Sequence, residues 1–266
     1  MTAFTGTSYY YRRFRPGIPA ALAALLAQET SAGSPLRLLD VGTGPGLVAR
    51  ALAPYFDEVI AVDSDQAMCA EAEAALRPAL SAGQRLHVQH TLAEDFMPPV
   101  GWQPHLVTCG RVFHWLDQPR LLNRLNEYIA PDGVLAVFSD RSLWTADSAW
   151  QQTTRTVAQH FLGEQQRAGD GVFDPPGQPD EEVLRASAFR EVTTATIPVR
   201  REWRTEEVLG YLYSTSFAAP HLFGDRQEAF EATLTDALAP FMEGEFLVED
   251  NAFTVLIARR PCVRGR

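Results

Sequence analysis

Three glycines at alternate positions follow a short apolar run that contains an acidic residue. Residues 38–41 include Asp40, and Gly42, Gly44 and Gly46 come next. Because glycine lacks a Cβ, it adopts turn conformations that other residues avoid and lets the backbone approach a ligand closely. The run before the glycines has the composition of a buried strand in a parallel sheet. The pattern therefore predicts a turn at the sheet edge where open α/β proteins bind ligands.

The spacing of the glycines excludes two common phosphate-binding turns. A dinucleotide fingerprint, G-x-G-x-x-G, would need a third glycine where Leu47 stands. A P-loop needs a Gly-Lys-Ser/Thr ending, and the chain contains no lysine. Residues 47–52 are helix formers, so we expect the glycines to join a strand to a helix. On these residues alone, an ordinary glycine-rich turn of another Rossmann-like fold remains an alternative.

A second apolar run, residues 58–62, also ends in an acidic residue, Asp63. Asp63 lies near the offset at which Rossmann-like sites place a carboxylate on ribose hydroxyls. An ionised aspartate only accepts hydrogen bonds, so it can receive both hydroxyl protons. The second run therefore predicts a ribose-bearing ligand.

The motif D-x-G-x-G-x-G over residues 40–46 resembles the first motif of the class I S-adenosylmethionine-dependent methyltransferases. Further segments resemble the type eleven methyltransferases, which include trans-aconitate methyltransferase. These are the Tyr-x-x-Phe-Arg-Pro opening at residues 11–16, Ala-Glu-Asp at 93–95 and Phe-His-Trp-Leu-Asp at 113–117. Phe14 and Ile18 stand where relatives carry tyrosine, which suggests different substrate contacts.

The resemblance implies S-adenosyl-L-methionine as cofactor and a set of residues that bind it. Asp63 would hold the ribose, and Ala93 and Glu94 would meet the adenine edge. Arg15 would pair with the methionine carboxylate, which suits its planar fork. Met68 would either pack on the adenine face or fill the core. The full set is Tyr11, Arg15, Asp40, Gly42, Thr43, Gly44, Gly46, Asp63, Ser64, Met68, Ala93, Glu94 and Arg111.

Methyl transfer from a sulfonium requires alignment of the acceptor, exclusion of water and sometimes removal of a proton. His114 is the candidate catalytic residue, as a base or an orienting group, because histidine titrates near neutral pH. Its alternative is a structural role that anchors the loop around it. Tyr211 and Ser214 are candidate substrate-binding residues, in a segment that resembles the cap helix of relatives.

Composition narrows the classes of function. The chain has 266 residues, 46% of them hydrophobic, and a net charge of −10, which argues against a general nucleic-acid binder. Its three cysteines lack the spacing of a disulfide framework or a zinc site, and we expect no metal. No signal peptide or membrane-spanning run is apparent, so we expect a cytoplasmic protein, monomeric or homodimeric, without membrane partners.

Alternating apolar runs and helical patterns predict a doubly wound, Rossmann-like α/β sheet with a mostly helical cap. The resemblance adds an antiparallel last strand. We expect strands near 36–41, 58–62, 86–90, 104–109, 133–138, 192–199 and 252–258, and helices near 20–30, 150–166, 205–216 and 226–241. The expected divisions are an N-terminal arm and helix over the cofactor pocket (1–35), a cofactor-binding core (36–140), cap insertions (141–187 and 203–246) and closing strands (188–202 and 247–260).

These residues together predict a methyltransferase that acts on a small molecule at an oxygen, nitrogen or carbon nucleophile. Two alternatives retain the cofactor site. The same scaffold serves enzymes of pericyclic or elimination type that bind S-adenosylmethionine, and it could serve a partner protein without activity. The motifs strongest in resemblance bind cofactor, so they leave the acceptor undefined.

Overall fold

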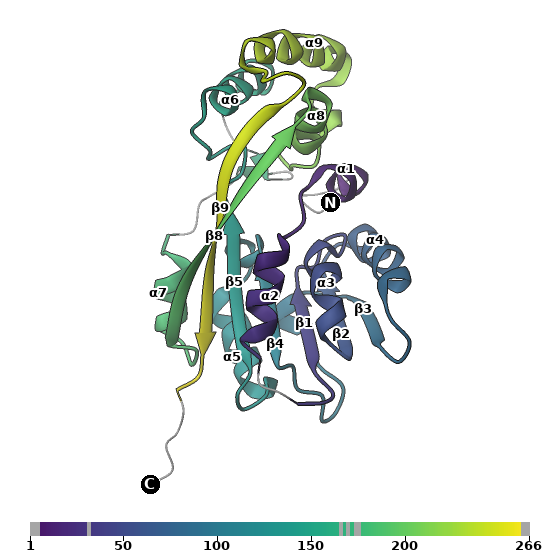
Figure 1. Cartoon of the computed structure of the whole chain (residues 1–266), viewed down its shortest axis with the longest axis vertical. Coiled ribbons are helices and arrows are strands. Elements are labelled where there is room, and N and C mark those ends of the chain that lie inside the picture. The colour runs from purple at the N-terminus through teal and green to yellow at the C-terminus, as the bar shows by residue number, and fades with distance from the viewer. Residues whose placement is uncertain (1–5, 31–32, 165–166, 169–170, 173–176, 262–266) are drawn as a thin grey trace. The chain divides into compact units, whose positions relative to one another are not determined.

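A computed structural model describes residues 6–30, 33–164, 167–168, 171–172 and 177–261 of the chain. It contains a seven-stranded sheet in the order β3-β2-β1-β4-β5-β9-β8. The first five strands in chain order pair in parallel, and β9 runs opposite to β5 and β8 (Figure 1). The strands are β1 (Arg37–Val41), β2 (Glu58–Asp63), β3 (Arg85–His90), β4 (Leu106–Gly110), β5 (Val134–Asp140), β8 (Glu191–Trp203) and β9 (Leu247–Arg259). The predicted fold class and the antiparallel last strand are confirmed.

Helices connect and flank these strands. Asp65 is the N-cap of α4, and its carboxylate accepts hydrogen bonds from the backbone amides of Ala67 and Met68. Asp117 begins α5 in the same way through the amide of Arg120. The helices are α1 (Ser8–Phe14), α2 (Ala20–Gln28), α3 (Leu47–Leu52), α4 (Gln66–Leu76), α5 (Gln118–Tyr128), α6 (Ala149–Leu162), α7 (Asp180–Arg185), α8 (Thr205–Tyr213) and α9 (Gln227–Leu238).

Several predicted boundaries were wrong, for identifiable reasons. α6 ends at Leu162 rather than near 166, because Gly163 adopts a left-handed φ of 89°. α9 gives way at Ala239 to a short 3-10 turn that contains a proline. β6 (Arg167–Ala168) and β7 (Gly171–Val172) form a small antiparallel pair in a part of the chain where no strand was predicted. Residues 169–170 and 173–176 lie outside the described parts.

β8 and β9 extend beyond the runs 192–199 and 252–258, but they lie almost completely within the expected closing segments 188–202 and 247–260. The additional part of β9 carries Glu249, which is only 3% exposed although it is charged. Its carboxylate accepts hydrogen bonds from the side chains of Gln151, Trp203 and Asn251, and pairs with Arg201. Burial of a carboxylate is tolerated when such partners satisfy it. This part of β9 is therefore partly buried although its sequence is polar.

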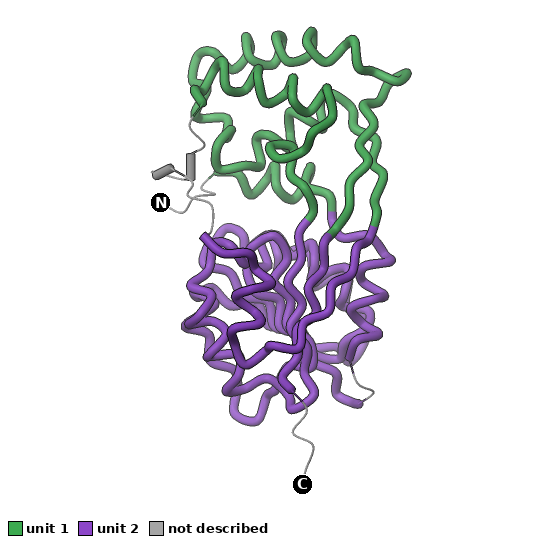
Figure 2. The backbone as a smooth tube through the Cα atoms, turned by 90° about the vertical axis from the view of Figure 1, so that its left-hand side faces the viewer, with its two compact units in different colours: residues 1–16, 140–174, 198–253 green, residues 17–139, 175–197, 254–266 purple. Residues whose placement is uncertain are grey.

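The chain divides into two compact units (Figure 2). The first unit comprises residues 1–16, 140–174 and 198–253, and the second comprises 17–139, 175–197 and 254–266. Apolar side chains of β1, β2, β4 and β5 form the core of the second unit together with α5 and α7. The core of the first unit is built largely from aromatic and leucine side chains of α6, α8 and α9.

Two segments have surroundings that the sequence did not indicate. The N-terminal residues expected as an arm form α1, which packs on α8, with the rings of Tyr10 and Tyr213 5.3 Å apart. α7, expected in the cap, places Leu184 in the core of the second unit. Among the described residues, no helix combines the length and apolar character needed to cross a membrane.

Candidate functional site

The glycine turn follows β1 in the second unit. Gly42, Gly44 and Gly46 have φ angles of 61°, 53° and 82°, a region that side chains other than glycine rarely adopt. A Cβ built on Gly42 would lie only 2.3 Å from Cγ2 of Val112. The turn after β1 and the turn after β4 are thus in direct backbone-to-side-chain contact, which requires glycine at position 42.

Asp40 stabilises the glycine turn. Its carboxylate is 1% exposed and accepts hydrogen bonds from the hydroxyls of Thr43, at 2.7 Å, and Thr108, at 2.6 Å. Burial raises the pKa of Asp40 to about 6, although both hydroxyls act in the opposite direction. Thr108 was not among the predicted residues; its only sequence signal is a hydroxyl within the otherwise apolar strand β4.

Asp63 ends β2 beside the same turn. Its Oδ2 accepts the backbone N–H of Gly44 at 2.8 Å, and its Oδ1 accepts the N–H of Asp65 at 2.9 Å. Desolvation by burial raises the pKa of Asp63, with these two amides opposing the shift. Each carboxylate oxygen offers about two acceptor sites, so one on each oxygen remains for a further donor.

The remaining predicted cofactor residues of the second unit lie on neighbouring elements. Met68 is 3% exposed within the core side of α4, whereas Ser64 is exposed at the end of β2. Ala93 and Glu94 are buried in a 3-10 turn (Ala93–Asp95) after β3. Oε1 of Glu94 accepts the backbone N–H of Asp117 at 2.8 Å, which ties this turn to the start of α5.

Arg111 follows β4 and has an unusual backbone conformation. Its φ is 59°, in the left-handed region that costs a non-glycine residue conformational energy. Its N–H donates a 2.8 Å hydrogen bond to the carbonyl oxygen of Phe138, which fixes the turn against the end of β5. Such strain is concentrated at functional sites in proteins, and sequence motifs gave no sign of it.

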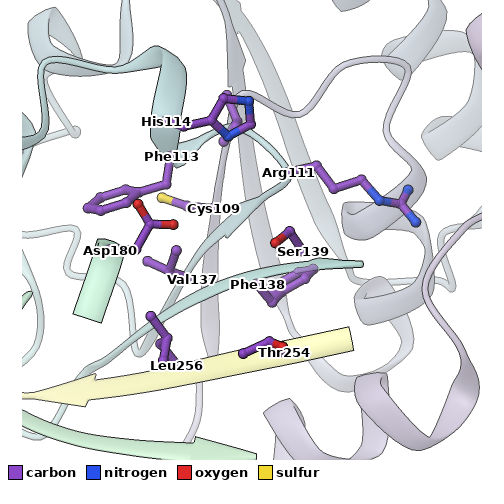
Figure 3. Close-up of a pocket in the computed structure, with 11 residues that line it drawn as sticks. Cys109, Arg111, Phe113, His114, Val137, Phe138, Ser139, Asp180, Thr254 and Leu256 are labelled. Atoms are coloured by element: carbon purple, nitrogen blue, oxygen red, sulfur yellow. The ribbon is translucent and has the colours of Figure 1, made fainter. Parts of the chain in front are cut away.

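Beside this turn is a cavity of about 70 Å³ in the second unit (Figure 3). It is lined by residues after β4, at the end of β5, at the start of α7 and in β9. His114 lies at its edge in a short 3-10 turn (Phe113–Trp115), and desolvation by burial lowers its pKa. The lining residues are Cys109, Arg111, Val112, Phe113, His114, Val137, Phe138, Ser139, Asp180, Thr254 and Leu256.

The four predicted residues of the first unit come together around Arg15. Its Nε donates to Oγ of Ser214 at 2.8 Å, and one terminal nitrogen donates to the hydroxyl of Tyr211 at 3.3 Å. The guanidinium carbon lies 4.8 Å from the ring centre of Tyr11 and 4.5 Å from that of Tyr211. Stacked arginine of this kind is attracted by the ring faces. Residues nearly two hundred positions apart in sequence thus form one cluster.

A model of the methyltransferase domain family matches residues 11–167, which is more than half of the chain. The chain belongs to this methyltransferase family. S-adenosyl-L-methionine is its cofactor. The family assignment confirms the predicted resemblance at the level of a methyltransferase; the matched family does not specify the type eleven subgroup.

Curated relatives of this family match over part of their length. The protein CRG1 of Saccharomyces cerevisiae, described as a probable S-adenosylmethionine-dependent methyltransferase, is 26% identical over 129 residues, covering 48% of this chain and 44% of the yeast protein. The methyltransferase pgmE of Aspergillus terreus is 33% identical over 114 residues, covering 42% of this chain and 33% of that protein. The matched region thus spans less than half the length of either relative.

Solved structures share the fold over nearly the whole chain. One, from Anaeromyxobacter dehalogenans and provisionally assigned as a type II methyltransferase, has a TM-score of 0.58 at 21% identity and covers 92% of this chain and 97% of its own. The protein YcgJ of Bacillus subtilis has a TM-score of 0.55 at 14% identity and covers 91% of this chain and 100% of its own. At such identities, the likeness establishes the methyltransferase fold.

The described residues contain no group of three or more histidine, cysteine, aspartate or glutamate side chains arranged to hold a metal ion. Cys69 and Cys109 are both buried free thiols, and burial raises the pKa of each. Raised thiol pKa values oppose thiolate formation at neutral pH. Neither cysteine therefore has the character of a nucleophile.

Proposed function

We propose that the chain transfers the methyl group of S-adenosyl-L-methionine to a small-molecule acceptor by in-line displacement. One contact carries the proposal: Gly42 abuts Val112, and Val112 lines the cavity that His114 borders. Cofactor and acceptor must meet within bonding reach for such a displacement. The glycine turn and the cavity meet at the end of β4, as this requirement demands.

The residues around the glycine turn suit the cofactor chemically. Its ribose presents two hydroxyl donors, and Asp63 retains acceptor capacity on both oxygens after binding two backbone amides. Gly42 and Gly44 add no side chains to the turn, and their positive φ angles disfavour other residues at these positions. Ala93 and Glu94 would bound the adenine. We assign Met68 to core packing beneath that site, because its side chain is almost completely buried.

The bound sulfonium already supplies the activation needed for transfer. The protein's task is to orient the acceptor, exclude water and receive a proton. Burial lowers the pKa of His114 and so favours the neutral imidazole, the form that can accept a proton. Phe113 and Val137 supply apolar walls to the cavity. His114 is therefore the proposed proton acceptor.

The resemblance supports roles for the first unit as well. Arg15 would hold the methionine carboxylate of the cofactor, with Tyr11 against it, since a guanidinium fork matches a carboxylate. Tyr211 and Ser214 already orient Arg15 through hydrogen bonds. These two residues are thus proposed to position Arg15 in addition to meeting substrate.

The acceptor is proposed to be a small molecule because of the charge of the chain. A net charge of −10 opposes binding to a polyanion, which is normally driven by a basic surface. A bacterial relative is named as a tRNA adenine methyltransferase, at 29% identity over 150 residues. Weak binding to RNA at low salt would be the first sign against the small-molecule proposal.

The direct test combines calorimetry with a turnover screen. We expect S-adenosylhomocysteine to bind, and small acceptors to trigger its release from S-adenosylmethionine. A chain that does not bind either cofactor form would contradict the cofactor site. Binding without methyl transfer to oxygen, nitrogen or carbon acceptors would instead favour a different reaction on this scaffold.

A further inference from the structure

The cavity beside β4 contains one acidic side chain that no motif indicates. Asp180 is the first residue of α7, and its carboxylate projects among Cys109, Phe113 and Val137 in Figure 3. The chain segments that form the cavity are far apart in sequence, so only the fold brings Asp180 and His114 to the same cavity. Acidic residues are common in the first turn of a helix for electrostatic reasons. The sequence alone therefore gave no reason to assign Asp180 a further role.

The surroundings of Asp180 leave its charge largely uncompensated. Oδ1 accepts one hydrogen bond from the side-chain amide of Gln118, at 3.2 Å. Within the parts of the chain that the structure describes, no arginine or histidine forms an ion pair with this carboxylate. Arg111 also lines the cavity, but Figure 3 shows its guanidinium directed away from Asp180. Desolvation raises the pKa of Asp180, as expected for a half-buried acid without a cationic partner.

We propose that the cavity receives the amino group of an amine acceptor, with Asp180 as the counter-charge and His114 as the proton acceptor. This inference rests on the proposed methyltransferase function and defines its acceptor. A cavity of about 70 Å³ fits a reacting group and a few attached carbons rather than a whole metabolite. An ammonium group would supply the donors and the charge that Asp180 lacks.

The reaction balances with these groups and solvent. A bound ammonium loses one proton through the neutral imidazole of His114, which passes it on to water, and becomes an amine with a free electron pair. That pair forms the new nitrogen–carbon bond while the sulfur–carbon bond breaks, and sulfur keeps the bonding electrons. The positive charge thereby moves from sulfur to nitrogen, where the carboxylate of Asp180 stabilises it as it develops.

The same charge argues against other acceptors. A carboxylate acceptor would place a second negative charge next to the half-buried carboxylate of Asp180, and the two like charges would repel. A hydroxyl acceptor would gain a hydrogen bond but would leave the charge of Asp180 unpaired.

The test compares acceptors of matched shape: phenethylamine, 2-phenylethanol and 3-phenylpropanoic acid, with butylamine, butanol and pentanoic acid as an aliphatic set. S-adenosylhomocysteine release measures turnover, and calorimetry with the protein–S-adenosylhomocysteine complex measures acceptor binding. We expect kcat/KM, or affinity where turnover is slow, to favour amines by roughly tenfold or more, the size of one charge-assisted contact.

Asp180→Asn and Glu182→Gln form a matched pair of variants. Both remove one negative charge from the first turn of α7, but Glu182 is exposed and does not line the cavity. Asp180→Asn should lose most of the preference for amines over alcohols, with S-adenosylhomocysteine affinity and thermal unfolding close to wild type. Glu182→Gln should retain the preference.

Two results would overturn the inference without touching the cofactor site. One is normal S-adenosylhomocysteine binding with neither turnover nor binding of any amine. The other is a loss of turnover or binding in Asp180→Asn that is equal for amines and alcohols. That result would mean that Asp180 only stabilises α7. If the wild-type chain does not bind S-adenosylhomocysteine at all, the underlying proposed function is refuted instead.

Discussion

Two aspartates at the ends of neighbouring strands, Asp40 buried and Asp63 partly exposed, have different environments and different proposed roles. The carboxylate oxygens of Asp40 accept hydrogen bonds from Thr43 and Thr108, and the residue is almost completely buried. Asp63 binds two backbone amides and retains acceptor capacity at the sheet edge. Asp40 therefore organises the turn, whereas Asp63 is available for ligand hydroxyls.

The role of Asp63 predicts a selective loss of cofactor affinity. Asp63→Asn removes the charge that strengthens hydrogen bonds to ribose, which should weaken S-adenosylmethionine binding roughly ten- to a hundredfold. Asp65→Asn is the control, because asparagine begins a helix as well as aspartate does and the change in net charge is the same. Calorimetry that finds both variants equally impaired, or neither, would contradict the assignment.

The environment of Asp40 predicts a pH dependence of stability. Its pKa is about 6 in the folded chain against an ordinary value of 3.8, so between these values the folded form holds a proton that the unfolded form releases. The free energy of unfolding should therefore fall as pH rises from 4 to 6, by up to about 3 kcal/mol from this group.

Denaturant unfolding of wild type and Asp40→Asn across that range isolates the effect of Asp40. Asp63 has a raised pKa and contributes in the same direction, but it is present in both proteins. We expect a flatter pH profile for Asp40→Asn. Parallel profiles would show that the carboxyl of Asp40 has an ordinary pKa in the folded state.

At the level of elements, the turns after β1 and β4 act as one unit because Gly42 leaves room for Val112. Gly42→Ala would place its Cβ against that side chain and force alanine into a left-handed φ. We expect a loss of stability of about 1–3 kcal/mol and weaker cofactor binding. The measurements are thermal unfolding and calorimetry.

A second substitution separates the two causes. Val112→Ala removes the two γ carbons that a new Cβ at position 42 would meet, but it leaves the Cβ of residue 112, at 2.9 Å, and the backbone strain in place. The double variant Gly42→Ala/Val112→Ala should regain part of the stability that the single substitution at Gly42 loses. If it regains none, the contact with the γ carbons of Val112 does not cause the loss.

At the scale of the whole molecule, the first unit gathers the N-terminal helix α1 with segments from the second half of the chain. α1 lies against α8 where Gly210 leaves space, since a Cβ there would come within 2.3 Å of the ring of Phe14. Alanine favours a helix over glycine by about 1 kcal/mol, so any loss on Gly210→Ala must come from the displaced neighbour.

Gly210→Ala should therefore increase amide hydrogen exchange in α1 while α8 stays helical. If Tyr11 and Arg15 contact the cofactor, as proposed, S-adenosylhomocysteine affinity should fall with it. Gly177→Ala is a control, because its Cβ would meet nothing within 4 Å. Faster exchange in α1 with unchanged affinity would remove the N-terminal helix from the cofactor site.

The sequence alone predicted the fold class, the approximate positions of the main strands and the methyltransferase family, because these depend on local patterns. Apolar runs, glycine spacing and the acids at strand ends are properties of short segments, and each constrains the backbone directly. The apolar runs alone did not mark the ends of β8 and β9, because the burial of Glu249 depends on distant partners such as Arg201.

Only the tertiary structure decided which residues share a site. Thr108, which binds Asp40, and Asp180, which enters the cavity of His114, have no distinguishing pattern in sequence. Parallel strands joined through helices bring the ends of β4 and β5 and the start of α7 to one place, although their residues are up to seventy positions apart. The proposed acceptor chemistry depends on that convergence of side chains, which local sequence cannot encode.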